Sequence, residues 1–134
     1  MLAREHGRLY IVNRNTKDKL VYKVEAEFPF DSTRKRMSVI LKDEGGKYCI
    51  LCKGADTVMY DRITYEKNGI ENLRKIIEDD LYKYSCEGLR TLVMTKRNVS
   101  KNEYTKFRKI YDKLMCSNHP LKEKKLLELF DAME

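Results

Sequence analysis

The sequence predicts an α+β domain in which an antiparallel β-sheet, formed early in the chain, is flanked by helices that come later. Three observations support this prediction. Short apolar segments separated by turns fill the first part of the chain, whereas apolar residues at helical spacing dominate the later part. The 134 residues suffice for a core without disulfides and suit one domain, so we expect residues 1–134 to form a single unit.

Four strands are expected before the first helix. Residues 8–13 form the first, and residues 20–27 alternate well enough between apolar and polar side chains for the second. Pro29 should end that strand or mark it as an edge, because proline has no N–H to donate. Residues 37–42 and 47–53 follow as a hairpin, and the latter segment is apolar at nearly every position, which indicates a central strand.

The pattern then changes to helical spacing. Residues 55–62 are expected to form a short helix. A longer helix is indicated by an apolar stripe between residues 70 and 84, and Gly88 breaks this pattern. Residues 91–96 are predicted to form a fifth strand, which returns the chain to the sheet.

Two more helices are expected near the end of the sequence. Ser100 and Glu103 have the spacing of a capping box, which predicts the start of a helix. Pro120 suits the first turn of the last helix, where its missing N–H has no intrahelical partner to lose. The apolar faces of the two helices are predicted to contain Tyr104, Phe107, Tyr111, Leu114, Leu126, Leu127, Phe130 and Met133.

Composition limits the possible classes of protein. With 42% apolar and 37% charged residues, the sequence is typical of a soluble globular domain rather than a disordered chain. No apolar run approaches the roughly 18 residues of a membrane span, and the first ten residues lack the apolar core of a signal peptide. The net charge of +7 favours an anionic partner, although lysine-rich helices can also be merely soluble.

The cysteines and histidines predict no metal or redox centre. Cys49 and Cys52 have CxxC spacing, but they lie in an apolar strand, where residues three apart face opposite sides. Without a second such pair, we expect buried free thiols in a reduced, cytosolic compartment. His6 and His119 are isolated, so neither is expected to bind a metal or to act in catalysis.

Common catalytic motifs are missing from the sequence. It contains no P-loop, no GxGxxG fingerprint, no GxSxG elbow and no HExxH pair, so we expect no catalysis by this chain alone. Three basic positions remain as candidates for binding. They are Arg34, Lys35 and Arg36 after Phe30, Lys53 before Gly54, and Arg90 before Thr91.

A ring and several cations can together form a nucleotide site. An exposed aromatic ring offers a stacking face worth about 1–3 kcal/mol per base, and lysine or forked arginine donors match phosphate oxygens. Each residue also has an ordinary structural interpretation. Phe30 could belong to the core, the run Arg34–Arg36 could be a solvated strand entrance, and Lys53 and Arg90 could be surface cations. The pattern by itself leaves both interpretations open.

Three blocks of sequence resemble the nucleotide-binding domain of P-type ATPases, most closely its phospholipid flippase subclass. They are FDSTRKRMSV at residues 30–39, CKGADTV at residues 52–58 and EGLRTL at residues 87–92. Their order and approximate spacing match the family, and the resemblance covers most of the chain. It implies an ATP-binding site composed of Phe30, Ser32, Lys35, Lys53, Gly54, Arg90 and Thr91.

The resemblance also implies a role for the main residues of this site. Phe30 would stack on adenine, while Phe28 packs below it. Lys35 would lie near the nucleotide, with the neighbouring arginines facing the phosphates. Lys53 would line the deep pocket and Arg90 would steer the phosphates.

In the whole enzyme, a domain of this kind delivers the γ-phosphate of ATP, with Mg²⁺, to an aspartate on a separate phosphorylation domain, and this drives lipid movement. The Asp-Lys-Thr-Gly-Thr motif and membrane helices are missing here, so the chain is expected to bind ATP without hydrolysing it. It resembles a cytosolic, monomeric fragment of an integral membrane protein, truncated at its N-terminal side. The phosphorylation and actuator domains would be its partners.

Two rival interpretations rest on charge. The net charge of +7 and the nine tyrosines are compatible with a nucleic-acid binder, although most of the tyrosines fall on apolar faces. The lysine-rich region at residues 101–125 could instead contact acidic lipid or a regulatory tail. This interaction module could coexist with ATP binding.

Overall fold

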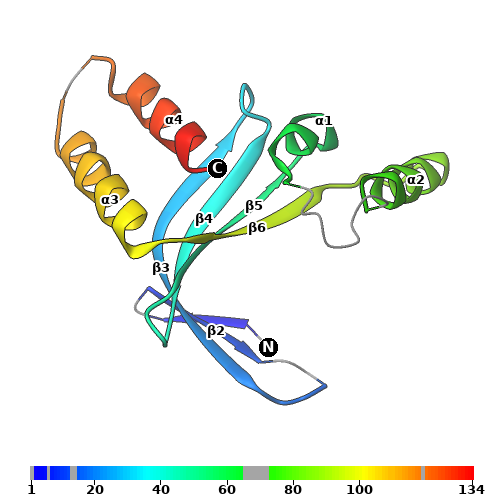
Figure 1. Cartoon of the computed structure of the whole chain (residues 1–134), viewed down its shortest axis with the longest axis horizontal. Coiled ribbons are helices and arrows are strands. Elements are labelled where there is room, and N and C mark those ends of the chain that lie inside the picture. The colour runs from blue at the N-terminus through cyan, green and yellow to red at the C-terminus, as the bar shows by residue number, and fades with distance from the viewer. Residues whose placement is uncertain (1, 6, 13–14, 65–72, 119) are drawn as a thin grey trace.

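The computed structural model describes residues 2–5, 7–12, 15–64, 73–118 and 120–134. Its centre is a six-stranded antiparallel sheet in which each strand pairs with the next along the chain (Figure 1). The strands are β1 (Leu2–Glu5), β2 (Arg8–Val12), β3 (Lys19–Asp31), β4 (Arg36–Asp43), β5 (Tyr48–Gly54) and β6 (Val93–Val99). The predicted α+β class with an antiparallel sheet is confirmed.

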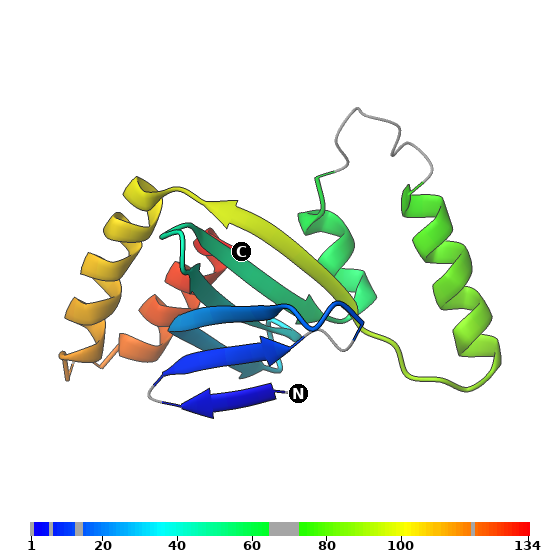
Figure 2. The ribbon, with the colours of Figure 1, turned by 90° about the horizontal axis from the view of Figure 1, so that it is seen from below.

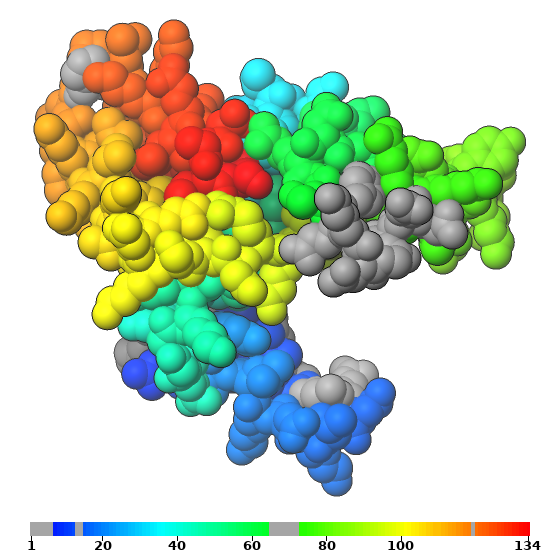
Figure 3. Space-filling view, viewed as in Figure 1, coloured from blue at the N-terminus to red at the C-terminus, as the bar shows by residue number. Residues whose placement is uncertain are grey.

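Helices interrupt and follow the sheet. They are α1 (Asp56–Met59), the 3-10 turn η1 (Tyr60–Arg62), α2 (Leu73–Cys86), α3 (Lys101–Met115) and α4 (Lys122–Met133). Figures 1 and 2 show α3 and α4 together on one side of the molecule, while α1 and α2 lie toward the other end of the sheet. In the space-filling view α2 projects from the body of the molecule (Figure 3). None of the helices in the described ranges combines the length and apolarity needed to cross a bilayer.

The predicted elements are present, with shifted ends. The strands predicted at residues 8–13, 37–42 and 47–53 correspond to β2, β4 and β5, and β5 lies between two other strands as expected. The last strand begins and ends later than predicted. The short β1 was not predicted, because its sequence LARE has neither alternation nor β-branched residues.

Strand β3 continues through Pro29 instead of ending before it. Its pairing with β2 covers only Lys19–Lys23, so at Pro29 the strand has β4 on one side and no described strand on the other. A proline at such an edge breaks no ladder hydrogen bond. The predicted edge position is therefore confirmed, whereas the predicted end of the strand is wrong.

The core lies between the sheet and the helices α3 and α4. Phe28 of β3 is 0% exposed and stacks on Phe130 of α4 with their ring centroids 4.0 Å apart. Phe107 of α3 lies 5.5 Å from the Phe28 ring. Ile40 and Ile50 continue this surface on β4 and β5. Phe28 was predicted to pack inside the domain, and this is confirmed.

Helix ends follow the predicted signals in part. The Ser100 hydroxyl accepts a hydrogen bond from the Glu103 N–H at 3.1 Å, as a capping residue should. Gly88 adopts φ 74°, and the Leu89 N–H bonds back to the Tyr84 carbonyl at 3.0 Å, which ends α2. Pro120 lies in a turn before α4 rather than inside its first turn.

Helix α2 confirms the predicted helix, but much of its apolar side stays exposed, although Leu81 packs against the small cluster of Cys52, Met59 and Val93. The first part of the predicted stripe, including Ile70, lies outside the described residues. Within α2 no residue is buried, and Leu73, Ile76 and Tyr84 are exposed. The apolar stripe therefore predicted the helix correctly, but it did not indicate how much of that stripe would be buried.

The thiols of the CxxC pair are separated by the strand, as predicted. Cys49 and Cys52 are both buried and free, and burial raises the pKa of each thiol above its ordinary value. No group of three or more potential metal ligands occurs among the residues that the structure describes. His6 and His119 lie outside the described residues.

We expect a limiting amount of iodoacetamide at neutral pH to alkylate Cys86 and Cys116 long before Cys49 and Cys52. The first two thiols are exposed, whereas the other two are buried and held in the unreactive protonated form. Peptide mass spectrometry at increasing reaction times measures the four rates. Rapid modification of Cys52 in the folded protein would contradict this assignment, and all four thiols should react in urea.

Candidate functional site

One face of the sheet carries an exposed row of large side chains that the helices do not cover. The strand register aligns Met37 of β4 with Lys53 of β5, and Lys53 with Met94 of β6. Met94 is 74% exposed, and Met37 is also exposed. This row crosses three neighbouring strands, which are spaced about 4.8 Å apart.

Phe30 extends the row onto β3 through a bulge. Phe28 pairs with Ser38 and Asp31 pairs with Arg36, so Pro29 and Phe30 together oppose the single residue Met37. An extra residue of this kind re-aims the side chains at the bulge. Phe30 is consequently 65% exposed, although Phe28 two residues earlier is fully buried.

The predicted pair Phe30 and Lys53 therefore lies in one row on the open face. Between them stands Met37, whose flexible thioether can pack against a ring. Lys53 is exposed beside Met94. Neither methionine was predicted as a site residue. Alternation along β6 could have indicated Met94, because it places Met94 on the face of the sheet opposite the buried Val93. An apolar strip with a lysine in it can hold a flat ring and an anionic group together.

Lys35 lies in the tight turn between β3 and β4. The Asp31 carboxylate accepts hydrogen bonds from the Thr33 N–H at 3.0 Å and the Arg34 N–H at 2.8 Å. The Asp31 carbonyl accepts from the Lys35 N–H at 2.7 Å. Lys35 adopts the left-handed conformation, with φ 52°, and its residue is exposed. The predicted contact Ser32 is exposed in the same turn.

Gly54 is buried where β5 meets this turn. A Cβ at this position would lie 2.6 Å from the Arg36 Cβ and 2.8 Å from the Lys35 carbonyl oxygen. The next N–H, that of Ala55, donates to the same Lys35 carbonyl at 3.1 Å. Gly54 therefore permits the close approach that joins the Lys35 turn to the end of β5 and to Lys53.

The arginines on either side of Lys35 do not face the open side of the sheet. Arg34 and Arg36 are buried, with exposures of 7% and 3%. Arg34 Nη2 contacts Glu134 Oε1 at 2.9 Å, and Arg36 Nε contacts Glu134 Oε2 at 2.5 Å. Arg34 also lies over the Phe130 ring, 5.5 Å from its centroid. The expectation that these arginines face phosphates is wrong, because both are ion-paired beneath α4.

Asp131 of α4 completes this ion cluster. Its carboxylate accepts from Arg36 Nη2, and from Arg62 Nη2 at 2.6 Å. Burial alone would raise the pKa of Asp131, but the hydrogen bonds and charges of the two arginines hold it below its ordinary value. Burial likewise disfavours charged Arg36, yet Glu134 and Asp131 raise its pKa overall. The Asp131 pairs therefore persist at neutral pH and weaken only as the pH falls below about 4.

Arg90 and Thr91 lie in the exposed segment that leads from α2 into β6. β6 begins at Val93, which pairs with Gly54. The segment therefore reaches the sheet at the end where Lys53 and the Lys35 turn lie. The structure brings Phe30, Lys35, Lys53 and Gly54 into one region, and it places the Arg90 segment at the entrance of the adjoining strand.

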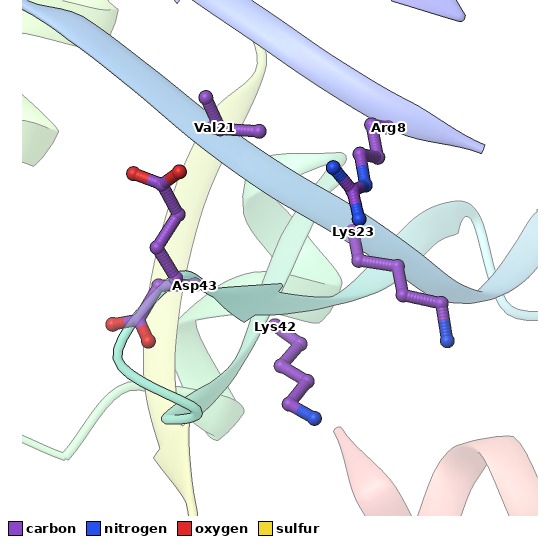
Figure 4. A pocket seen from close by; sticks show the side chains of 6 residues that line it. Arg8, Val21, Lys23, Lys42 and Asp43 are labelled. Atoms are coloured by element: carbon purple, nitrogen blue, oxygen red, sulfur yellow. The ribbon is translucent and has the colours of Figure 1, made fainter. Parts of the chain in front are cut away.

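A separate hollow of about 340 Å³ lies at the other end of β4. Its lining comes from β2, β3, β4 and the turn after β4 (Figure 4). Arg8, Lys23 and Lys42 supply cations, but Asp43 and Glu44 line it as well. The mixed charge gives this hollow no strong preference for an anion, and it contains none of the predicted ATP-binding residues.

Comparison with known proteins identifies the family. Residues 8–127 match the family model described as P-type ATPase, cytoplasmic domain N. The chain is 41% identical over 114 residues to "Phospholipid-transporting ATPase 10" of Arabidopsis thaliana, covering 85% of this chain and 9% of that protein. It is 36% identical over 113 residues to "Phospholipid-transporting ATPase dnf2" of Schizosaccharomyces pombe, covering 84% and 8%.

"Probable phospholipid-transporting ATPase 11" of Arabidopsis thaliana is 38% identical over 114 residues, covering 85% of this chain and 9% of that protein. The chain thus spans less than a tenth of the length of these relatives. The resemblance read from the three sequence blocks is confirmed by these matches, which extend well beyond the blocks. The chain therefore belongs to the family of P-type ATPase cytoplasmic N domains.

Proposed function

We propose that this chain is the ATP-binding domain of a phospholipid-translocating P-type ATPase. The observation that carries the proposal is the exposed row on the open sheet face, in which Phe30, Met37, Lys53 and Met94 lie side by side across neighbouring strands. A nucleotide needs a flat apolar surface for its base and cations for its phosphates. The row and the adjoining Lys35 turn supply both on a rigid sheet.

Adenine would stack on Phe30. Phe30 is 65% exposed, so it contributes little buried apolar surface to the stability of the fold, and its exposed face is available for a ligand. Met37, which opposes it, would pack against the edge of the base. Stacking of this kind contributes about 1–3 kcal/mol per base.

The phosphates would lie toward Lys35, Lys53 and Arg90. Gly54 lets the chain approach closely between the two lysines, and Ser32 and Thr91 offer hydroxyls beside Lys35 and Arg90. Mg²⁺ would arrive bound to the ATP phosphates. The fit to ATP rests on this combination of exposed ring and cations, since the lysine and arginine donors match phosphate oxygens.

In the parent protein, the bound ATP would present its γ-phosphate to an aspartate on a separate phosphorylation domain. Residues 1–134 would act as one monomeric cytosolic unit of an integral membrane protein, with the phosphorylation and actuator domains as partners. The chain alone would bind ATP without hydrolysing it. The lipid-transporting relatives named above support phospholipid as the transported substrate.

An NMR titration of the isotope-labelled chain with ATP tests the proposal, because the protein has no tryptophan for fluorescence. We expect saturable shifts clustered at Phe30, Lys35, Lys53 and Arg90. An absence of shifts at millimolar ATP would mean a binding free energy weaker than about −4 kcal/mol and would contradict the proposal. Shifts confined to residues 101–125 would instead favour the alternative of a basic interaction module.

Arg90→Ala should weaken ATP binding more than adenosine binding. Adenosine keeps the base and sugar but lacks the phosphates that the guanidinium would contact, and one charge-assisted hydrogen bond is worth about 1.5–3 kcal/mol. Parallel NMR titrations give both dissociation constants. Arg8→Ala, in the separate mixed-charge hollow, is the matched control and should alter neither. Equal losses for the two ligands would remove Arg90 from the phosphates.

A further inference from the structure

Glu134 holds the arginines on both sides of Lys35 with a single buried carboxylate. Its side chain is fully buried. Oε1 contacts Arg34 Nη2 at 2.9 Å, Oε2 contacts Arg36 Nε at 2.5 Å, and the Ser38 hydroxyl donates to Oε1 as well. Figure 1 shows the corresponding arrangement of elements, with the end of α4 beside the β3–β4 turn.

The same arginines bond to each other's backbone across Lys35. Arg34 Nη2 donates to the Arg36 carbonyl at 3.4 Å, and Arg36 Nη1 donates to the Arg34 carbonyl at 3.0 Å. The two guanidinium groups therefore hold the backbone carbonyls of the residues on either side of Lys35. Arg34 Nε and Nη1 are buried without a hydrogen-bond partner in the described part of the chain, so Arg34 depends on the Glu134 carboxylate for its charge compensation.

Lys35 needs such a clamp because of its backbone. A non-glycine residue with φ 52° is in a disfavoured left-handed conformation, which persists only where the surroundings enforce it. Arg34 and Arg36 point inward because both form buried ion pairs with the Glu134 carboxylate. Lys35, which lies between them, is left facing outward. Losing that carboxylate would leave buried Arg34 without its charge partner and Arg36 with Asp131 alone, and the turn would relax toward solvent.

We propose that Glu134 is a positioning residue that holds Lys35 in the left-handed turn and so directs its ammonium group toward the phosphates of ATP. The expected effect on ATP binding rests on the proposed function. The effect on the conformation of Lys35 does not, because it can be measured in the ligand-free chain. Glu134 itself does not touch the nucleotide. It acts through Arg34 and Arg36, from a helix about 100 residues away in sequence.

The test compares Glu134→Gln with Met133→Ala, a neighbouring core truncation that loosens the same end of α4 without removing charge. In the ligand-free state, we expect Glu134→Gln to change the backbone chemical shifts of Lys35 away from left-handed values, while Met133→Ala keeps them. In titrations, Glu134→Gln should weaken ATP binding by about three- to tenfold and adenosine binding by less than about twofold. Met133→Ala should affect neither when binding is measured well below its melting temperature.

Equal behaviour of the two variants would overturn the inference, because Glu134 would then serve stability alone. If Glu134→Gln does not fold, Glu134→Asp takes its place: it keeps the charge but cannot reach both arginines, so altered Lys35 shifts are expected and unchanged shifts would overturn the proposal. If the unmodified chain fails to bind ATP, the proposed function is wrong, yet the ligand-free shifts of Lys35 still decide the positioning role.

Discussion

Phe28→Ala is expected to lower the free energy of unfolding by about 3–5 kcal/mol, whereas Phe30→Ala changes it by less than about 1 kcal/mol. The two rings are two residues apart on β3, but the bulge at Pro29 and Phe30 sends them to different environments. Phe28 is stacked on Phe130 in the core, and Phe30 is 65% exposed. Urea denaturation followed by far-ultraviolet circular dichroism measures both values.

Binding should show the opposite order. Phe30→Ala removes the proposed stacking face and should weaken ATP binding by about 1–3 kcal/mol, which is roughly fivefold to 150-fold. Phe30→Tyr keeps the ring and should keep most of the affinity. Phe28→Ala, titrated at a temperature where it remains folded, should bind ATP nearly as the unmodified chain does. A strongly destabilised Phe30→Ala would mark Phe30 as a core residue and contradict its role as a stacking platform.

Period-two alternation could not have separated Phe28 from Phe30, because residues two apart on a regular strand face the same side. The resemblance to the family selected Phe30, and the bulge at Pro29 and Phe30 is what turns the two rings to different environments. Alternation does separate Cys49 from Cys52, which lie three residues apart on β5. Sequence patterns thus describe a regular strand well but do not show where a bulge interrupts it.

The environment of Arg34 and Arg36 could not be predicted in this way. Their partners Asp131 and Glu134 lie 95 to 100 residues later in the chain. No local pattern distinguishes an arginine that reaches such a partner from one that reaches solvent or a phosphate. The three cations therefore looked equivalent in the sequence, although the fold buries two of them and exposes one.

Helix α2 shows a second limit of sequence patterns. Its apolar stripe predicted a helix, and the helix is present, but Leu73, Ile76 and Tyr84 remain exposed. Periodicity reports which side of a helix is apolar and says nothing of the surface that this side meets. The position of the Arg90 segment, which follows α2, depends on that same tertiary information.

Arg36→Met is expected to lower the free energy of unfolding by about 3–5 kcal/mol, because it leaves part of the buried Glu134 carboxylate uncompensated. The neighbouring Lys35→Met removes the same charge and introduces the same side chain. Because Lys35 is exposed, and lysine and methionine meet the same backbone restriction at φ 52°, we expect this change to cost less than about 0.5 kcal/mol. Urea denaturation of both variants at neutral pH measures the contrast.

Ligand binding completes the comparison between these adjacent cations. Lys35→Met should weaken ATP binding while leaving adenosine binding unchanged, since the lost ammonium group would contact only phosphate. Added salt should reduce the ATP affinity of the unmodified chain, because salt screens exposed charges. It should restore very little of the stability lost in Arg36→Met, because the uncompensated Glu134 carboxylate is buried. Similar stability losses for the two variants would mean that Lys35 is also structural. Two adjacent cations with the expected opposite responses would establish that the fold divides the RKR run between core and ligand.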